Sequence, residues 1–190
     1  MEFKYHFKQN MNIDNFEFAF QYTIGNEGGF TKDPNDSGNW TGGSIGSGQL
    51  KGTKYGISAA SYPNLDIENL TLDQAKTIYR NDFWNKYNYD KINSSIVSTK
   101  CFDMTVNMGQ NATFIIQLAI KSFVNDIVID GNIGPVTIQN INSINENSLF
   151  DCLETASGVY YWTLANKANK NLRKYLPGWL IRAFKIIKGQ

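Results

Sequence analysis

The chain has 190 residues, of which 42% are hydrophobic and 14% aromatic, so it is long enough and apolar enough for a globular protein with a sizeable core. Its formal net charge of +1 gives no electrostatic case for binding nucleic acid or an anionic membrane surface. With one histidine, His6, and two widely separated cysteines, Cys101 and Cys152, the chain lacks the material for a histidine-dependent nucleophile, a zinc site or a disulfide framework.

From this composition we expect no metal, no cofactor and two buried free thiols. Residues 1–11 form a predicted polar arm that lacks the unbroken apolar core of a signal peptide. The sequence also contains no apolar span of about 18 residues, the length that a membrane-crossing helix needs. We therefore expect a chain that is made in the cytoplasm and does not insert into a membrane.

The first predicted helix is capped by Asn12 or Asp14 and ends at Glu27. Its apolar positions recur at helical spacing, at Phe16, Ala19, Phe20, Thr23 and Ile24. Glu27 shares their face, because it follows Phe16 by eleven residues, about three turns, and Gly28-Gly29 then ends the helix. Partial burial raises the pKa of a carboxyl, as a general acid requires near neutral pH. Spacing alone, however, favours a solvated surface glutamate.

The segment that follows is rich in Gly, Asn, Ser and Thr as far as Thr53, with few apolar positions. This composition is typical of a long irregular hairpin or flap, here folded back over the end of the first helix. The flap carries Asp33, Asp36 and Thr53, three polar side chains that we expect to face Glu27 across a cleft.

Two helices are predicted in the middle of the chain. Thr71 and Gln74 form a capping box that opens a helix reaching about Tyr87. The next helix spans residues 95–108 and ends at Gly109 as a left-handed cap. The aromatic run that closes the first of them is predicted to pack in the core, with stacking of Trp84 or Tyr87 on a sugar as the alternative.

The C-terminal half is also predicted to be helical. Asn111 caps one helix, Asp130-Gly131 forms a tight turn, and a short helix starts just after Pro135. A long amphipathic stripe and a final helix starting at Pro177 complete the chain. Because no low-complexity linker separates the halves, we expect them to pack into one body.

Several of these runs resemble known families. EGGF, DPNDSG and TKYGIS are similar to the catalytic segment of the N-acetylmuramidases of glycoside hydrolase family 108, which are lysozyme-like and also called secretion activator proteins. The run DGNIGPVT resembles the DGxxGPxT motif of the helical peptidoglycan-binding domains that follow this catalytic domain. The resemblance implies a mainly α, lysozyme-like fold with a small irregular β-hairpin or flap after the first helix. It implies a catalytic domain at residues 12–109 and a helical peptidoglycan-binding domain at residues 110–190 packed on it.

The resemblance also implies an activity, hydrolysis of the β-1,4 bond between N-acetylmuramic acid and N-acetylglucosamine in peptidoglycan glycan strands. Glu27 would be the general acid, Asp36 would hold the attacking water, as in inverting enzymes, and Thr53 would help to position it. The eight residues between Glu27 and Asp36 match the spacing in phage-type lysozymes, whereas the interval to Thr53 is longer. Asp33 competes with Asp36 for this role. Without a well-placed second carboxylate, Glu27 would act nearly alone and release an anhydro product, as lytic transglycosylases do.

Substrate contacts are implied at three further positions. The run FDMTVNMG resembles FDxxVNxG of the same family, which implies that Asp103 and Asn107 line the cleft and hydrogen-bond hydroxyl or N-acetyl groups. Their spacing of four residues alone favours a solvated polar face. Tyr55 is expected to pack against a sugar ring.

Two other functions stay open. The secretion activator label of similar chains motivates a non-catalytic peptidoglycan-binding or secretion-associated protein that retains the fold. The third hypothesis is an interaction module whose glycine-rich flap binds a protein partner. If the chain is an endolysin-like enzyme made in the cytoplasm, it needs separate help, such as a phage holin, to act on the cell wall or in the periplasm.

Overall fold

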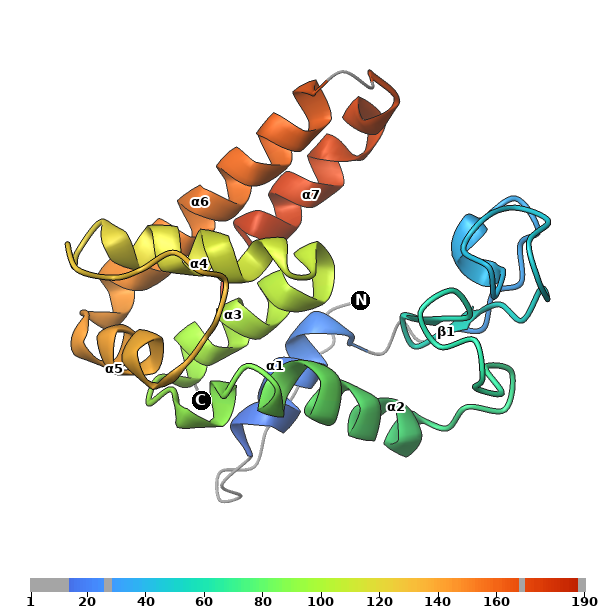
Figure 1. Ribbon diagram of the computed structural model, residues 1–190, viewed down its shortest axis with the longest axis horizontal. Coiled ribbons are helices and arrows are strands. Elements are labelled where there is room, and N and C mark those ends of the chain that lie inside the picture. The colour runs from blue at the N-terminus through green and yellow to red at the C-terminus, as the bar shows by residue number, and fades with distance from the viewer. Residues whose placement is uncertain (1–13, 26–28, 168–169, 188–190) are drawn as a thin grey trace, which may run out of the picture.

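The computed structural model describes residues 14–25, 29–167 and 170–187. Within these ranges, seven α-helices are accompanied by one two-stranded antiparallel sheet and a few short 3-10 or π turns (Figure 1). The predicted mainly α fold with a small β-hairpin after the first helix is therefore confirmed.

Helix α1 (Asn15–Thr23) is shorter than predicted. Asp14 is the N-cap, and its carboxylate accepts a hydrogen bond of 3.1 Å from the Phe16 amide. The helix ends before Gly25, which has a φ of +61°, a left-handed conformation that glycine adopts without steric cost. The prediction that the helix continues to Glu27 is wrong, and so is the argument that helical spacing places Glu27 on the apolar face. Glu27 itself lies outside the described residues.

Between α1 and α2 the chain forms a lobe of loops, here called the hairpin lobe (residues 29–68), which lies at the right of Figure 1. It contains the 3-10 turn η1 (Ser37–Asn39) and the strands β1 (Thr53–Lys54) and β2 (Ile57–Ser58), which pair antiparallel. The predicted irregular hairpin is confirmed, although its regular sheet is very short.

Helix α2 (Leu72–Tyr79) begins with the predicted capping box, in which the side chains of Thr71 and Gln74 cap each other's backbone. The α-helix ends at Tyr79 rather than at Tyr87 and continues as a π-helical turn, η2 (Arg80–Asn85). Such π turns are rare and are frequently found at functional sites. The 3-10 turn η3 (Tyr89–Lys91) then leads to α3.

Helix α3 (Ser95–Met108) occupies the centre of the molecule and packs against α1, α4 and α6. Most of its side chains are buried, and it ends at the predicted Gly109, which has a φ of +59°. The C-terminal half consists of α4 (Asn111–Lys121), α5 (Pro135–Ser143), α6 (Glu146–Asn166), the 3-10 turn η4 (Lys170–Tyr175) and α7 (Leu176–Ala183). Helices from both sides of residue 109 thus share one core.

The helix starts in this half agree only partly with the expectation. Gln110, not Asn111, is the N-cap of α4, and its side chain makes no capping hydrogen bond. The Asn111 side-chain amide donates to the Met108 carbonyl at 3.3 Å. Pro135 is the first residue of α5, as predicted. Helix α7 begins one residue before Pro177, at Leu176.

Both cysteines are free thiols, but only Cys101 is buried, and Cys152 is half-buried. None of the described helices is long and apolar enough to cross a membrane. Across residues 14–25, 29–167 and 170–187, no three His, Cys, Asp or Glu side chains lie close enough together to hold a metal ion.

The core is organised around an aromatic cluster on α3. The Phe102 ring, fully buried, makes edge-on contacts with the rings of Phe16, Trp84 and Tyr79, at centroid distances of 5.9, 5.7 and 6.3 Å. These three rings come from α1, η2 and α2, so a single side chain joins three elements. Trp84 is a core residue and therefore not a sugar-stacking surface.

Replacing Phe102 with alanine is expected to reduce the free energy of unfolding by about 3–5 kcal/mol, since it leaves a cavity at the junction of three elements. Urea denaturation of the purified variant measures this loss. The matched control is Val136→Ala, a truncation at a side chain that is 66% exposed, with an expected change within about 0.5 kcal/mol. Equal unfolding midpoints for the two variants would contradict the central role of Phe102.

Candidate active site

A cleft of about 990 Å³ runs across the molecule. Its lining residues come from four segments: 56–62 in the hairpin lobe, 79–87 from the end of α2 to just past η2, 106–110 at and after the end of α3, and 130–132 between α4 and α5. This volume is at the upper end of the ~300–1,000 Å³ range of small-molecule sites, and the four segments are spread over the chain. The cleft therefore suits an extended ligand.

The side chains of the cleft combine aromatic rings with hydrogen-bonding groups. Tyr62 and Tyr87, both half-buried, lie near Asp82 and Lys86. The Tyr62 hydroxyl donates a hydrogen bond of 2.7 Å to Asp82 Oδ2. Burial, together with the Asp82 carboxylate, raises the pKa of Tyr62, so its phenol keeps the proton. Amphipathic rings beside polar groups are suited to a ligand with both apolar faces and hydroxyls.

Three predicted residues lie in one hydrogen-bonded part of the hairpin lobe. Thr53 Oγ1 donates to Asn39 Oδ1 at 2.7 Å, and Asn39 Nδ2 donates to the Asp33 carbonyl at 3.0 Å. Asn39 is fully buried, so its amide fixes both partners. Asp36 caps η1, with Oδ1 accepting from the Gly38 amide at 2.9 Å.

The two aspartates differ in how their carboxylates are engaged. Both are exposed. Asp33 Oδ1 accepts hydrogen bonds from both the backbone amide and the side-chain amide of Asn35, at 2.9 and 3.2 Å. Neither aspartate nor Thr53 is among the residues that line the cleft. Glu27 belongs to the segment 26–28 that joins α1 to this lobe, outside the described residues.

Tyr55 forms part of the turn between the two strands. It has a φ of +52° and is followed by Gly56 with a φ of +74°, a pair of positive angles typical of a type I′ hairpin turn. Its carbonyl accepts a hydrogen bond of 3.0 Å from the Tyr79 hydroxyl, which anchors the hairpin on α2. The cleft is lined by Gly56 and Ile57 next to it, not by the Tyr55 side chain.

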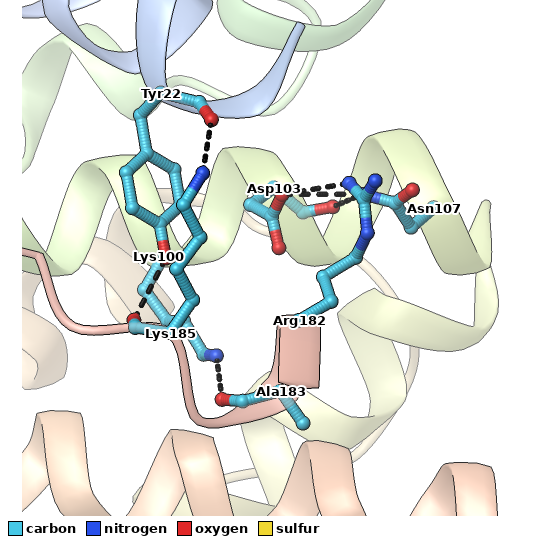
Figure 2. Close-up of polar contacts among 7 residues, drawn as sticks. All are labelled: Tyr22, Lys100, Asp103, Asn107, Arg182, Ala183 and Lys185. Carbon is cyan, nitrogen blue, oxygen red and sulfur yellow. Dashed lines mark hydrogen bonds and ion pairs between the residues drawn. The ribbon is translucent and has the colours of Figure 1, made fainter. Parts of the chain in front are cut away.

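Asp103 and Asn107 face α7 (Figure 2). Asp103 is 4% exposed, and its Oδ1 accepts from Arg182 Nη1 at 3.3 Å and from Asn107 Nδ2 at 3.2 Å. Burial raises the pKa of the Asp103 carboxyl, while the positive charges of Arg182 and Lys100 lower it. Asp103 is therefore held by an arginine that follows it by 79 residues, and neither residue of the predicted pair lines the cleft.

The same side of α3 carries a buried lysine. Lys100 Nζ donates to the Ala183 carbonyl at 2.5 Å, and burial lowers the pKa of this lysine. Nearby, the Tyr22 hydroxyl donates to the Lys185 carbonyl at 2.8 Å, and Lys185 Nζ donates to the Tyr22 carbonyl at 3.0 Å. Figure 2 shows that these contacts attach Ala183 and Lys185 to α1 and α3.

Sequence reasoning did not select the cleft residues Tyr62, Asp82 and Lys86, or Lys100 and Arg182. Tyr62 and its partner are 20 residues apart and belong to different elements, so no local motif connects them. Lys100 gave no signal either, because its partner is a backbone carbonyl rather than an acidic side chain.

Replacing Arg182 with methionine is expected to reduce the free energy of unfolding by about 1–3 kcal/mol, because it leaves the buried Asp103 carboxyl without its charged partner. Urea denaturation measures the change, with Arg173→Met, at an exposed arginine, as the matched control. The double variant Asp103→Asn, Arg182→Met should recover part of the loss, since a neutral amide replaces the carboxylate that lost its arginine. Wild-type stability of Arg182→Met would show that the ion pair does not hold α7 in place.

The comparisons with known proteins agree with this architecture. The family model for glycosyl hydrolase 108 matches residues 20–109, and the model for the predicted peptidoglycan domain matches residues 111–184. A solved structure from Brucella abortus, described as SagA, has a TM-score of 0.62 and 21% sequence identity. The match covers 88% of this chain and 92% of that one and shows that the two share a fold. No curated protein matches the chain.

Proposed function

We propose that the chain is a peptidoglycan hydrolase that cleaves the β-1,4 bond between N-acetylmuramic acid and N-acetylglucosamine. The matches of residues 20–109 to glycosyl hydrolase 108 and of residues 111–184 to the predicted peptidoglycan domain support this proposal. The structural support is a cleft of about 990 Å³ lined by tyrosines and polar side chains, one wall of which is formed by the hairpin lobe that also carries Asp36 and Thr53. An open cleft of this kind admits the interior of a polymer, as cleavage within a glycan strand requires.

The proposed mechanism uses Glu27 as the general acid that protonates the leaving glycosidic oxygen. Asp36 then holds the attacking water as the base, in an inverting reaction. This geometry requires a separation of about 6.5–9.5 Å between the two carboxyl groups. Asp36 is the better second carboxylate. Among the residues that the structure describes, Asp33 Oδ1 accepts two hydrogen bonds from Asn35, whereas the Asp36 carboxylate accepts one from Gly38.

Thr53 is proposed to position the same water. Its hydroxyl proton is directed at Asn39 Oδ1, 2.7 Å away. The lone pairs of the Thr53 oxygen therefore remain to accept a hydrogen bond from a water molecule. In this way the buried Asn39 would define how the water is oriented.

We propose more limited roles for the remaining predicted contacts. Asn107 is exposed, follows the cleft residue Val106 and gives its Nδ2 to Asp103, so its Oδ1 remains as an acceptor for a sugar hydroxyl or N-acetyl amide. Asp103 would act through Asn107 rather than touch the substrate. Tyr55 would pack against a sugar at the hairpin. We also propose that the enzyme is made in the cytoplasm and reaches the wall with separate help, such as a holin.

Replacing Glu27 with glutamine preserves the size of the side chain and removes the acid, so release of soluble fragments from purified sacculi should fall by about 100- to 10,000-fold. Mass spectrometry of the digests identifies the cut bond and distinguishes reducing from anhydro ends. Circular dichroism should show an unchanged fold. Near-wild-type release would eliminate Glu27 as the acid, while wild-type protein that sediments with sacculi but cleaves nothing would favour the non-catalytic binding function.

The activities of two variants distinguish which aspartate of the hairpin lobe, Asp36 or Asp33, acts as the base. Asp36→Asn is expected to reduce the rate of sacculus hydrolysis more than Asp33→Asn, because only the first removes the proposed base. Each variant serves as the other's control, since both change one exposed carboxylate in the same lobe. The reverse ranking would assign the base to Asp33, and release of anhydro ends by wild-type protein would remove the need for either.

A further inference from the structure

We propose that the turn Asp130–Asn132, which belongs to the segment that matches the peptidoglycan domain, is a saccharide-binding subsite at one end of the cleft. Its ligand is an N-acetylated sugar of the glycan strand, bound by the Asn132 amide and the Asp130 carboxylate. The identity of this polymer rests on the proposed function. Both family-matching segments would then contribute residues that bind the ligand in the cleft.

The turn lies on the wall of the cleft. Asp130, Gly131 and Asn132 line the same cleft as Tyr62 and the hairpin. In Figure 1 the hairpin lobe lies on the right and the connection between α4 and α5, which carries the turn, lies on the left of the same molecule. A ligand that fills the cleft therefore extends from one family-matching segment to the other.

Hydrogen bonds from the side chain of Gln117, in α4, fix the conformation of the turn. This side chain is 1% exposed, and its Nε2 donates to Asp130 Oδ1 at 2.8 Å and to the Asn132 carbonyl at 3.0 Å. Its Oε1 accepts from the Gly131 amide at 2.7 Å. One buried amide thus fixes all three residues of an exposed turn, which reduces the conformational entropy that a ligand must remove on binding.

The turn is also fixed relative to the other wall of the cleft. Asn88, which follows the cleft residue Tyr87, donates its side-chain amide to the Ile133 carbonyl at 3.0 Å. Gly131 has a φ of +77°, and a Cβ at this position would lie 2.6 Å from the Phe114 ring. Glycine is therefore required here, and the backbone sits directly on α4 without a side chain.

The exposed groups of the turn suit a sugar. Asp130 Oδ1 accepts from Gln117 and from the Asn132 backbone amide, and these hydrogen bonds lower the pKa of Asp130, so it remains a carboxylate. Among the described residues, neither Asp130 Oδ2 nor the Asn132 side chain makes a hydrogen bond. A carboxylate accepts from hydroxyls, and an amide both donates and accepts, as the N-acetyl group of the ligand does.

A turn with a structural role alone would explain the hydrogen bonds of Gln117 and Asp130 Oδ1 and the glycine at position 131. It would not require the Asn132 side chain. Asn132→Ala therefore separates the two explanations. The matched control is Asn125→Ala, another exposed asparagine in the same α4–α5 connection that does not line the cleft. Equal melting temperatures for the two variants show that the fold is retained. If Asn132→Ala melts lower, Asn132→Asp, which keeps the size of the side chain, replaces it.

Binding is measured in the full chain carrying Glu27→Gln, so that cleavage does not consume the ligand. The probe is peptide-free glycan strands released from sacculi with an amidase, titrated by calorimetry. Asn132→Ala should weaken binding by about 3- to 10-fold, the value of one or two hydrogen bonds, and Asn125→Ala should leave it unchanged. Equal affinities for the two variants would overturn the subsite. Sacculus cleavage by the unmodified chain is assayed separately, so a failure of the proposed activity would be distinguishable from a failure of this subsite.

Discussion

Burial of α3 is the constraint on which the rest of the structure depends. On one side, the Phe102 ring contacts aromatic rings from α1, α2 and η2; on the other, α3 packs against α4 and α6. The helix therefore joins the glycosyl hydrolase segment to the peptidoglycan-domain segment through one core. Val106 in its last turn, and Gly109 and Gln110 just after it, also line the cleft. Because protein interiors are close-packed, the geometry of the cleft depends on how α3 sits among its neighbours.

Polar contacts of the same helix hold Arg182 and Ala183 of α7 against it. Burying the charges of Lys100 and Asp103 is costly unless each finds a partner, and the partners are the Ala183 carbonyl and the Arg182 guanidinium. These contacts are directional, so they select one register of α7 where apolar packing would tolerate several. The polar face of α3 that the sequence suggests for substrate binding thus has a structural function that involves α7.

Local signals in the sequence predicted much of the helical framework. The capping box at Thr71 and Gln74, the helix ending at Gly109 and the proline that opens α5 each depend on hydrogen bonds or backbone angles within a few residues. The glycine-rich composition likewise predicted an irregular hairpin. The end of α1 was missed, because Gly25 stops the helix ahead of the glycine pair that appeared to be the signal.

The sequence by itself determined the mainly α class, the order of most helices and, through its motifs, the resemblance to a family of glycoside hydrolases. Only the tertiary structure decided which side chains meet: Tyr62 with Asp82, Asp103 with Arg182, and the turn after α4 with the cleft. The physical reason is the range of the interactions. Capping and helical periodicity act between near neighbours, whereas a cleft is made by segments far apart in the chain, whose positions depend on the packing of the whole core.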